Sequence, residues 1–90
     1  MNTALISVIL PAFNAEKYIS ESIDSILNQT HENFELIVLN DGSSDHTKDI
    51  ILGKKDNRIT YVENKTNQGI IKTLNKGLFV SRGQFVARMD

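Results

Sequence analysis

The fold is decided by one stretch of this 90-residue chain, Phe34-Glu-Leu-Ile-Val-Leu-Asn-Asp-Gly-Ser-Ser-Asp45. Residues 34–39 form a largely apolar run, which is typical of a strand buried on both faces of a parallel sheet. A polar segment follows at once, in which Gly42 permits a tight turn and Ser43 or Ser44 can cap a helix. A buried strand that leads through a polar turn into a helix predicts an α/β protein.

The same unit recurs on both sides of this stretch. Three further strands are predicted at residues 5–10, 58–63 and 84–89, the first of them ended by Pro11. Apolar residues at helical spacing predict helices over residues 15–27, 47–53 and 70–79, with Asn14 as the cap of the first. The order βαβαβαβ predicts a three-layer, Rossmann-like parallel sheet with helices on both faces.

Composition excludes several classes of protein. Ten Lys and Arg against 11 Asp and Glu give a net charge of −1, which argues against a polybasic binder of nucleic acid or membrane surfaces. The absence of cysteine excludes disulfides and thiolate zinc sites and favours a reducing cytosol. The apolar stretch near the N-terminus lacks a basic flank and is too short to span a membrane. We therefore expect a cytoplasmic protein.

Polar residues follow every predicted strand. They are Asn14 after the first, Asn40 and Asp41 after the second, Glu63 and Asn64 after the third, and Asp90 after the fourth. Ligands of open parallel sheets bind at this edge, although Asn and Asp also favour turns and caps. No glycine-rich phosphate loop is present, so a bound diphosphate would need a divalent metal held by carboxylates. The carboxylate of Asp41 can accept the imide N–H of a uracil ring.

These residues resemble the opening of family 2 glycosyltransferases. The segments that carry the resemblance are Ile6-Ser-Val-Ile-Leu-Pro-Ala-Phe-Asn14, Ser25-Ile-Leu-Asn-Gln-Thr30, Phe34 to Asp45, Asn67-Gln-Gly69, Asn75-Lys-Gly77 and Gly83-Gln-Phe-Val-Ala-Arg-Met-Asp90. The resemblance implies the nucleotide-binding part of a GT-A fold with strand order 3-2-1-4. It also implies a nucleotide-sugar donor, with a UDP-sugar as the first expectation.

The resemblance assigns roles to single positions. The nucleotide-binding positions that it implies are Pro11, Ala12, Phe13, Asn14, Asp41 and Asp90. Among them, Asp41 matches the aspartate that reads uracil, and Asp90 matches the first aspartate of the D-x-D element, beside a divalent Mg or Mn ion. Leu74 departs from the family pattern, since an arginine is common there.

The implied activity is transfer of a sugar to an acceptor hydroxyl on a glycan or lipid-linked acceptor, as in polysaccharide biosynthesis. Residues 1–90 are expected to be a truncated nucleotide-sugar-binding domain without a catalytic residue, inactive alone; the whole protein is placed in the cytoplasm or at the inner face of the membrane. The alternative is a non-catalytic α/β nucleotide-binding or interaction module. An exposed edge on the fourth strand, with Phe85, Val86 and Met89, predicts dimerisation there. No nucleic-acid partner is expected.

Overall fold

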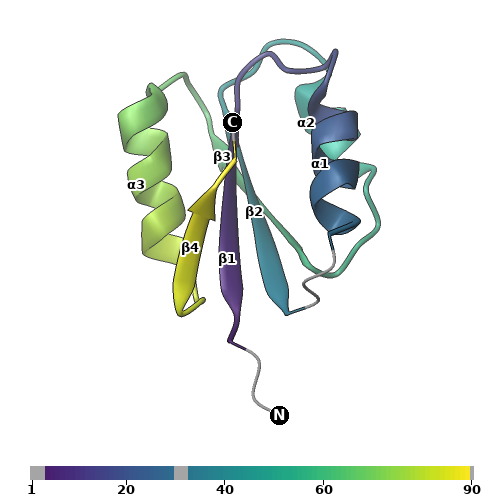
Figure 1. The fold of residues 1–90 in the computed structure, drawn as a ribbon. Coiled ribbons are helices and arrows are strands. Elements are labelled where there is room, and N and C mark those ends of the chain that lie inside the picture. The colour runs from purple at the N-terminus through teal and green to yellow at the C-terminus, as the bar shows by residue number, and fades with distance from the viewer. Residues whose placement is uncertain (1–3, 30–32, 90) are drawn as a thin grey trace.

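Parallel strands form the centre of the computed structural model, which describes residues 4–29 and 33–89 (Figure 1). Within these residues the strands are β1 (Ile6–Ala12), β2 (Phe34–Asp41), β3 (Ile59–Asn64) and β4 (Phe85–Arg88). They lie in the order β3-β2-β1-β4, and every neighbouring pair is parallel. The predicted strand order is therefore confirmed.

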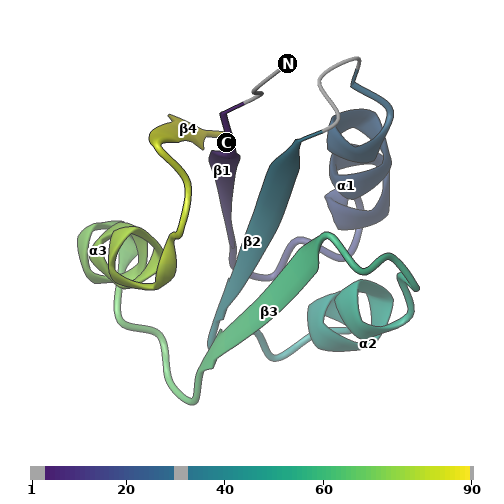
Figure 2. The ribbon, with the colours of Figure 1, turned by 90° about the horizontal axis from the view of Figure 1, so that it is seen from below.

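Helices cover both faces of this sheet. They are α1 (Ile19–Leu27), α2 (Thr47–Leu52) and α3 (Ile70–Val80). Figure 2 shows α1 and α2 on one face and α3 on the other. The predicted three-layer arrangement is confirmed, and the turns from each of the first three strands into the next helix meet at one edge of the sheet (Figure 1).

Strand β2 contributes to the core on both faces of the sheet. All eight of its residues are buried. Leu36 and Val38 pack in the cluster beneath α1 and α2, whereas Ile37 and Leu39 belong to the cluster beneath α3. Because successive side chains of a strand point to opposite faces, a strand covered on both sides is largely apolar. This explains the apolar run at residues 36–39, whereas the buried Glu35 is a hydrogen-bonded carboxylate.

The end of β1 differs from the prediction, because the strand continues through Pro11 to Ala12. Proline has no N–H to donate, so it is tolerated in a sheet only where no ladder bond is lost. The Ile9 carbonyl accepts from Met89 N, so the alternate backbone groups of β1, including those of Pro11, point toward β4. The described pairing with β4 stops opposite Ile9, and Pro11 therefore costs no bond to β2.

The start of α1 and the predicted caps of α1 and α2 also differ from the prediction. Helix α1 begins at Ile19, four residues later than predicted, and Asn14 does not cap it. Asn14 has a left-handed φ of 48°, and its Oδ1 accepts from Ser44 N at 2.8 Å, in the turn after β2. At the start of α2, Asp45 Oδ1 accepts from Thr47 N at 2.9 Å, in place of a serine cap. A contact with the turn after β2 thus replaces the predicted Asn14 cap, and a local contact with Asp45 replaces the predicted serine cap.

None of the helices in the described ranges has the length and apolar character needed to cross a membrane.

Candidate functional site

The carboxyl ends of β1 and β2 and the start of α3 enclose a pocket of about 250 Å³. Its lining residues are Pro11, Ala12, Phe13, Asp41, Asn67, Gly69, Ile70 and Thr73. Four of the predicted site residues, at positions 11, 12, 13 and 41, are thus brought together. The pocket lies at the switch point of the sheet, because α1 leaves β1 on one face while β4 is reached through α3 on the other.

Asp41 is the most constrained side chain of this pocket. It is only 5% exposed, and its carboxylate accepts three hydrogen bonds from the segment between β3 and α3. Oδ1 accepts from Asn64 Nδ2 at 2.8 Å and from Gln68 N at 2.7 Å, and Oδ2 accepts from Gly69 N at 3.0 Å. The carboxylate therefore holds residues 64–69 against the end of β2.

The same contacts keep Asp41 ionised. Burial by itself raises the pKa of the carboxyl group, but the hydrogen bonds from Gln68, Asn64 and Gly69 outweigh it and lower the pKa below its usual value. The Thr73 hydroxyl adds a smaller effect in the same direction. At neutral pH the group is an anion that can only accept hydrogen bonds.

Gly42 lets the segment at residues 64–69 pass close to the end of β2. Its φ is +72°, in the left-handed region that favours glycine. A Cβ at this position would lie 2.5 Å from both Asn67 N and the carbonyl carbon of Thr66. The glycine predicted for a tight turn is thus also required by the backbone that crosses over it.

Phe13 and Asn14 have different places although they are neighbours. Phe13 lines the pocket and remains 48% exposed, so its ring is available to a planar ligand. Asn14 is absent from the lining. Its N–H donates to Ser43 Oγ at 2.9 Å, and its side chain accepts from Ser44, so Asn14 braces the turn that carries Phe13.

The carboxylate that the resemblance assigns to a divalent metal belongs to Asp90, which lies outside the described residues. Residues 4–29 and 33–89 contain no group of three or more His, Cys, Asp or Glu side chains placed to hold a metal ion. Asp41 is occupied by three donors, and Glu63 pairs with Lys48 and accepts from Tyr61. The described side chains therefore do not form a metal site by themselves.

Sequence reasoning missed the residues that hold Asp41 in place. Asn64 was predicted at the binding edge, but its contact with Asp41 was not, and no contact of Gln68 or Gly69 with Asp41 was predicted. The segment Asn67-Gln-Gly69 does stand out among the family-like motifs. A turn motif of this kind, placed after a neighbouring strand, is the one signal that pointed to them.

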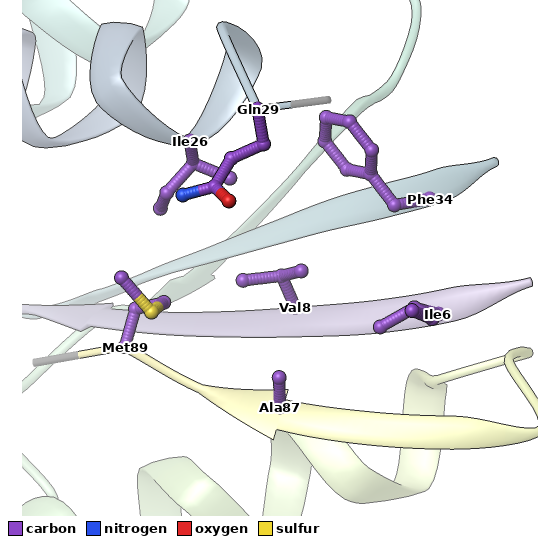
Figure 3. A pocket seen from close by; sticks show the side chains of 7 residues that line it. All are labelled: Ile6, Val8, Ile26, Gln29, Phe34, Ala87 and Met89. Atoms are coloured by element: carbon purple, nitrogen blue, oxygen red, sulfur yellow. The ribbon is translucent and has the colours of Figure 1, made fainter. Parts of the chain in front are cut away.

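A second hollow lies away from this edge, on the face of the sheet that α1 partly covers (Figure 3). It measures about 190 Å³ and is lined by Ile6, Val8, Ile26, Gln29, Phe34, Ala87 and Met89. Only the Gln29 side chain is polar, and no charged group points into it. Because ligand sites need convergent polar groups, this hollow is a gap in the helical cover of β1 and β4 rather than a candidate site.

Comparison with protein families gives a match over nearly the whole chain. The model described as Glycosyl transferase family 2 matches residues 7–90. An uncharacterized glycosyltransferase of Haemophilus influenzae is 53% identical over 91 residues, which cover 99% of this chain and 28% of the relative. The Escherichia coli UDP-Glc:alpha-D-GlcNAc-diphosphoundecaprenol beta-1,3-glucosyltransferase WfgD is 41% identical over 90 residues, which cover 100% of this chain and 36% of the relative. The chain thus spans about a third or less of these relatives.

Solved structures show the same arrangement of strands and helices. The mannosyltransferase PcManGT from Pyrobaculum calidifontis, in complex with GDP-Man and Mn²⁺, superposes with a TM-score of 0.86 at 25% identity. Residues 1–349 of TarS from S. aureus, in complex with UDP, superpose with a TM-score of 0.86 at 34% identity. Each superposition covers 94% of this chain and 26% of the other.

Proposed function

The chain belongs to glycosyl transferase family 2, and we propose that the pocket at the ends of β1 and β2 binds the nucleotide of a nucleoside-diphosphate sugar, with UDP preferred. The fold is the nucleotide-binding part of a GT-A glycosyltransferase. The observation that carries the proposal is the convergence of Phe13 and Asp41 in one pocket at the switch point of the sheet. An aromatic ring can stack on a nucleobase, and a fixed anion can accept a hydrogen bond from a ring N–H.

The fixed anion supports a base that offers a ring N–H. A carboxylate can accept about four hydrogen bonds; Oδ2 of Asp41 accepts from Gly69 N, and the Thr73 hydroxyl is a weaker partner of the same carboxylate. We propose that a ring N–H in the pocket takes the place of this weaker partner. Uracil and guanine each present a ring N–H beside a carbonyl, whereas adenine presents none. The site should thus prefer UDP or GDP over ADP.

The ring of Phe13 supports stacking on the base. Replacing an aromatic side chain that stacks on a base costs about 1–3 kcal/mol of binding. The ring is held by a turn that Asn14 and Ser43 tie to the neighbouring strand end, so little ordering is needed on binding. The pocket is thus largely preformed.

Calorimetric titration of the chain with UDP, GDP and ADP tests the proposal. We expect binding of UDP, weaker binding of GDP and no measurable binding of ADP. Asp41→Asn should weaken UDP binding at least tenfold, because it removes a charged acceptor worth about 1.5–3 kcal/mol. Phe13→Ala should weaken it at least fivefold without unfolding the exposed turn.

Matched controls keep the outcome decisive. Asp49→Asn removes an exposed carboxylate on α2, and Tyr18→Ala removes an exposed aromatic ring outside the pocket lining. Both controls should bind UDP like the unmodified chain. Equal affinity for ADP and UDP, or an unchanged affinity in Phe13→Ala, would contradict the assignment of the pocket. Thermal unfolding of every variant separates lost binding from lost folding.

We further propose that a protein with the length of the relatives transfers the sugar to an acceptor hydroxyl, with a divalent Mg or Mn ion held through Asp90. The E. coli relative is named for a diphosphoundecaprenol-linked acceptor and the archaeal structure contains Mn²⁺, which support a lipid-linked acceptor and a metal. Transfer of labelled sugar from UDP-sugars to lipid-linked glycans, with and without Mn²⁺, tests both points. No transfer by the whole protein would instead favour a non-catalytic nucleotide-binding module.

A further inference from the structure

The charges of this chain are separated along the sequence, although the net charge is only −1. Residues 1–63 contain ten acidic and five basic side chains, whereas residues 64–89 contain five basic side chains and no acidic one. Asymmetry of this size between two parts of a chain is typical of proteins that bind an anionic surface. The near-zero total conceals it.

The fold turns this separation into two unlike faces. Residues 64–89 comprise the end of β3, helix α3 and strand β4, and within the part of the chain that the structure describes α3 is the one helix on its face of the sheet (Figure 2). Lys65, Lys72, Lys76 and Arg82 are all exposed on or beside this helix. Helices α1 and α2, on the opposite face, carry Glu21, Asp24 and Asp49 together with Lys48, and Asp24 is paired with Lys54. The α3 face is therefore cationic, whereas the opposite face carries charges of both signs.

Large apolar side chains stand among the cations of α3. Thr73 and Gly77 are buried against the sheet, so the opposite side of the helix faces outward. On that side Ile71 is 71% exposed, Phe79 is 89% exposed, and Leu78 is about half exposed. We call the set Lys65, Ile71, Lys72, Lys76, Leu78 and Phe79 the α3 surface. An exposed apolar patch among charges marks an interaction site.

The cations of the α3 surface keep their charge available. Lys76 Nζ donates to neutral acceptors, Asn64 Oδ1 at 2.9 Å and the Glu63 carbonyl at 3.3 Å. Lys72 forms no hydrogen bond or ion pair with any residue in the described ranges. Glu63 is paired with Lys48 at 3.1 Å and also interacts electrostatically with Lys65. One carboxylate thus stands beside the three lysines of the α3 surface, which leaves a net positive charge there.

We propose that the α3 surface docks on a lipid bilayer rich in anionic headgroups. Lysines near such a membrane each contribute about 1 kcal/mol, and apolar side chains inserted at the headgroup boundary add the energy of their burial. The combination distinguishes a bilayer from other partners. Nucleic acid would use the cations but not an aliphatic and aromatic cluster on the same helix. A second copy of the α3 surface would be repelled by like charges.

Docking in this orientation places the candidate site beside the membrane. The first turn of α3 supplies Ile70 and Thr73 to the pocket lining, so the α3 surface and the pocket share one helix. A site at this position could meet an acceptor embedded in the bilayer. The docking itself does not depend on nucleotide binding, because none of the α3 surface residues lines the pocket.

Vesicle flotation of the chain tests the proposal. We expect binding to vesicles of about equal parts phosphatidylcholine and phosphatidylglycerol, loss of binding at high salt, and no binding to phosphatidylcholine alone. The double variant Lys65→Gln/Lys72→Gln should partition about 30-fold less, which is two charges at about 1 kcal/mol each. Phe79→Ser should partition about tenfold less or lower still.

The control variants make the same kinds of substitution at exposed residues outside the α3 surface. Lys17→Gln/Lys55→Gln removes the same charge, and Leu52→Ser removes an exposed apolar side chain of α2. Both should float like the unmodified chain. Phe79→Ser should still bind UDP normally, so a failure of docking can be told from a failure of the proposed function.

Three results would overturn the proposal. The first is equal binding to both vesicle types or to neither. The second is self-association without vesicles that Phe79→Ser abolishes, since it would show that a second copy covers the α3 surface. The third is tight binding to duplex DNA that Phe79→Ser leaves unchanged, since it would show recognition of phosphates alone.

Discussion

Glu35 is a buried carboxylate that joins three parts of the fold. Its Oε2 accepts from Ser7 Oγ at 2.5 Å and from Arg82 N at 2.7 Å, and its Oε1 accepts from Arg82 Nε at 3.1 Å. Ser7 in turn accepts from Gly83 N at 2.8 Å. β1, β2 and the turn before β4 thus meet at one side chain. An anion buried in this way is tolerated only because both of its oxygens accept hydrogen bonds.

This carboxylate should make stability depend on pH in the acid range. Burial by itself raises the pKa of Glu35, but the hydrogen bonds from Ser7 and Arg82 outweigh it and lower the pKa below 4.5. A lowered folded-state pKa contributes stability that is present above the unfolded-state pKa and is lost as pH falls through the folded-state pKa. We expect Glu35→Gln to lose about 1–3 kcal/mol of unfolding free energy at pH 7 and less below about pH 4.

Urea unfolding across pH values measures this difference. Other carboxylates titrate in the same range, among them Asp56 with a pKa of about 2, so only the difference between variant and unmodified chain reports on Glu35. Glu21→Gln, on the exposed side of α1, is the control and should change stability little at any pH. A Glu35→Gln curve that runs parallel to the unmodified one would show that the pKa of Glu35 is the same in the folded and the unfolded protein.

At the scale of the elements, hydrophobic patterns in the sequence predicted those strands and helices whose positions depend on burial alone. The largely apolar run at residues 34–39 corresponds to β2, because a strand buried on both faces is apolar at most positions. The helical spacing from Ile70 to Phe79 corresponds to α3, because a helix on a sheet buries one stripe of its surface. The start of α1 was wrong because Asn14 is fixed by Ser44, thirty residues away. Pro11 stays in β1 because its backbone faces β4, and the described pairing with β4 ends at Ile9. No local sequence pattern shows where this pairing ends.

The candidate site was also predictable in part: the strand ends that meet there could be predicted, but the contacts around Asp41 could not. Parallel strands bring their carboxyl ends to one edge, so the meeting of Asp41 with residues 11–13 follows from the strand order alone. The wrapping of residues 64–69 around Asp41 does not follow from it. That wrapping depends on Gly42 having no Cβ and on backbone N–H groups of Gln68 and Gly69, and backbone donors carry no signature in a sequence.

The docking of β4 on β1 depends on Gly83 at the preceding turn. A Cβ there would lie 2.6 Å from both Ser7 N and Ser7 Oγ and 2.8 Å from the Leu5 carbonyl oxygen. Two of these atoms belong to the backbone of the strand start and cannot turn aside. We expect Gly83→Ala to cost about 1–3 kcal/mol of unfolding free energy and to detach β4 first.

Hydrogen exchange shows which part of the sheet loses stability in Gly83→Ala. In Gly83→Ala the amide of Met89, which donates to Ile9 O, should exchange much faster, while amides of β2 keep most of their protection. Gly53→Ala is the control, because Gly53 has an ordinary helical φ of −75° at the end of α2. Uniform loss of protection through the whole sheet would mean that β4 does not open separately.

At the scale of the whole molecule, the sheet has two unlike edges. β3 forms one edge and is partly polar and flanked by the Glu63–Lys48 ion pair. β4 forms the other edge, and all four of its residues are exposed, Phe85 by 63%. Flat, apolar and unprotected edges are the ones that pair with another chain. The predicted dimerisation at this strand therefore remains a prediction with a physical basis.

The geometry of the ladder indicates which residue to change. Because Met89 N bonds toward β1, the backbone groups of Val86 point away from the sheet. We expect the chain to form a concentration-dependent dimer by sedimentation equilibrium. Val86→Lys should weaken the association at least severalfold, since two ammonium groups would meet across the paired edges. Thr60→Lys places the same charge on β3 and should leave the dimer intact. A monomer at every concentration, or equal weakening by both lysines, would show that the β4 edge does not pair.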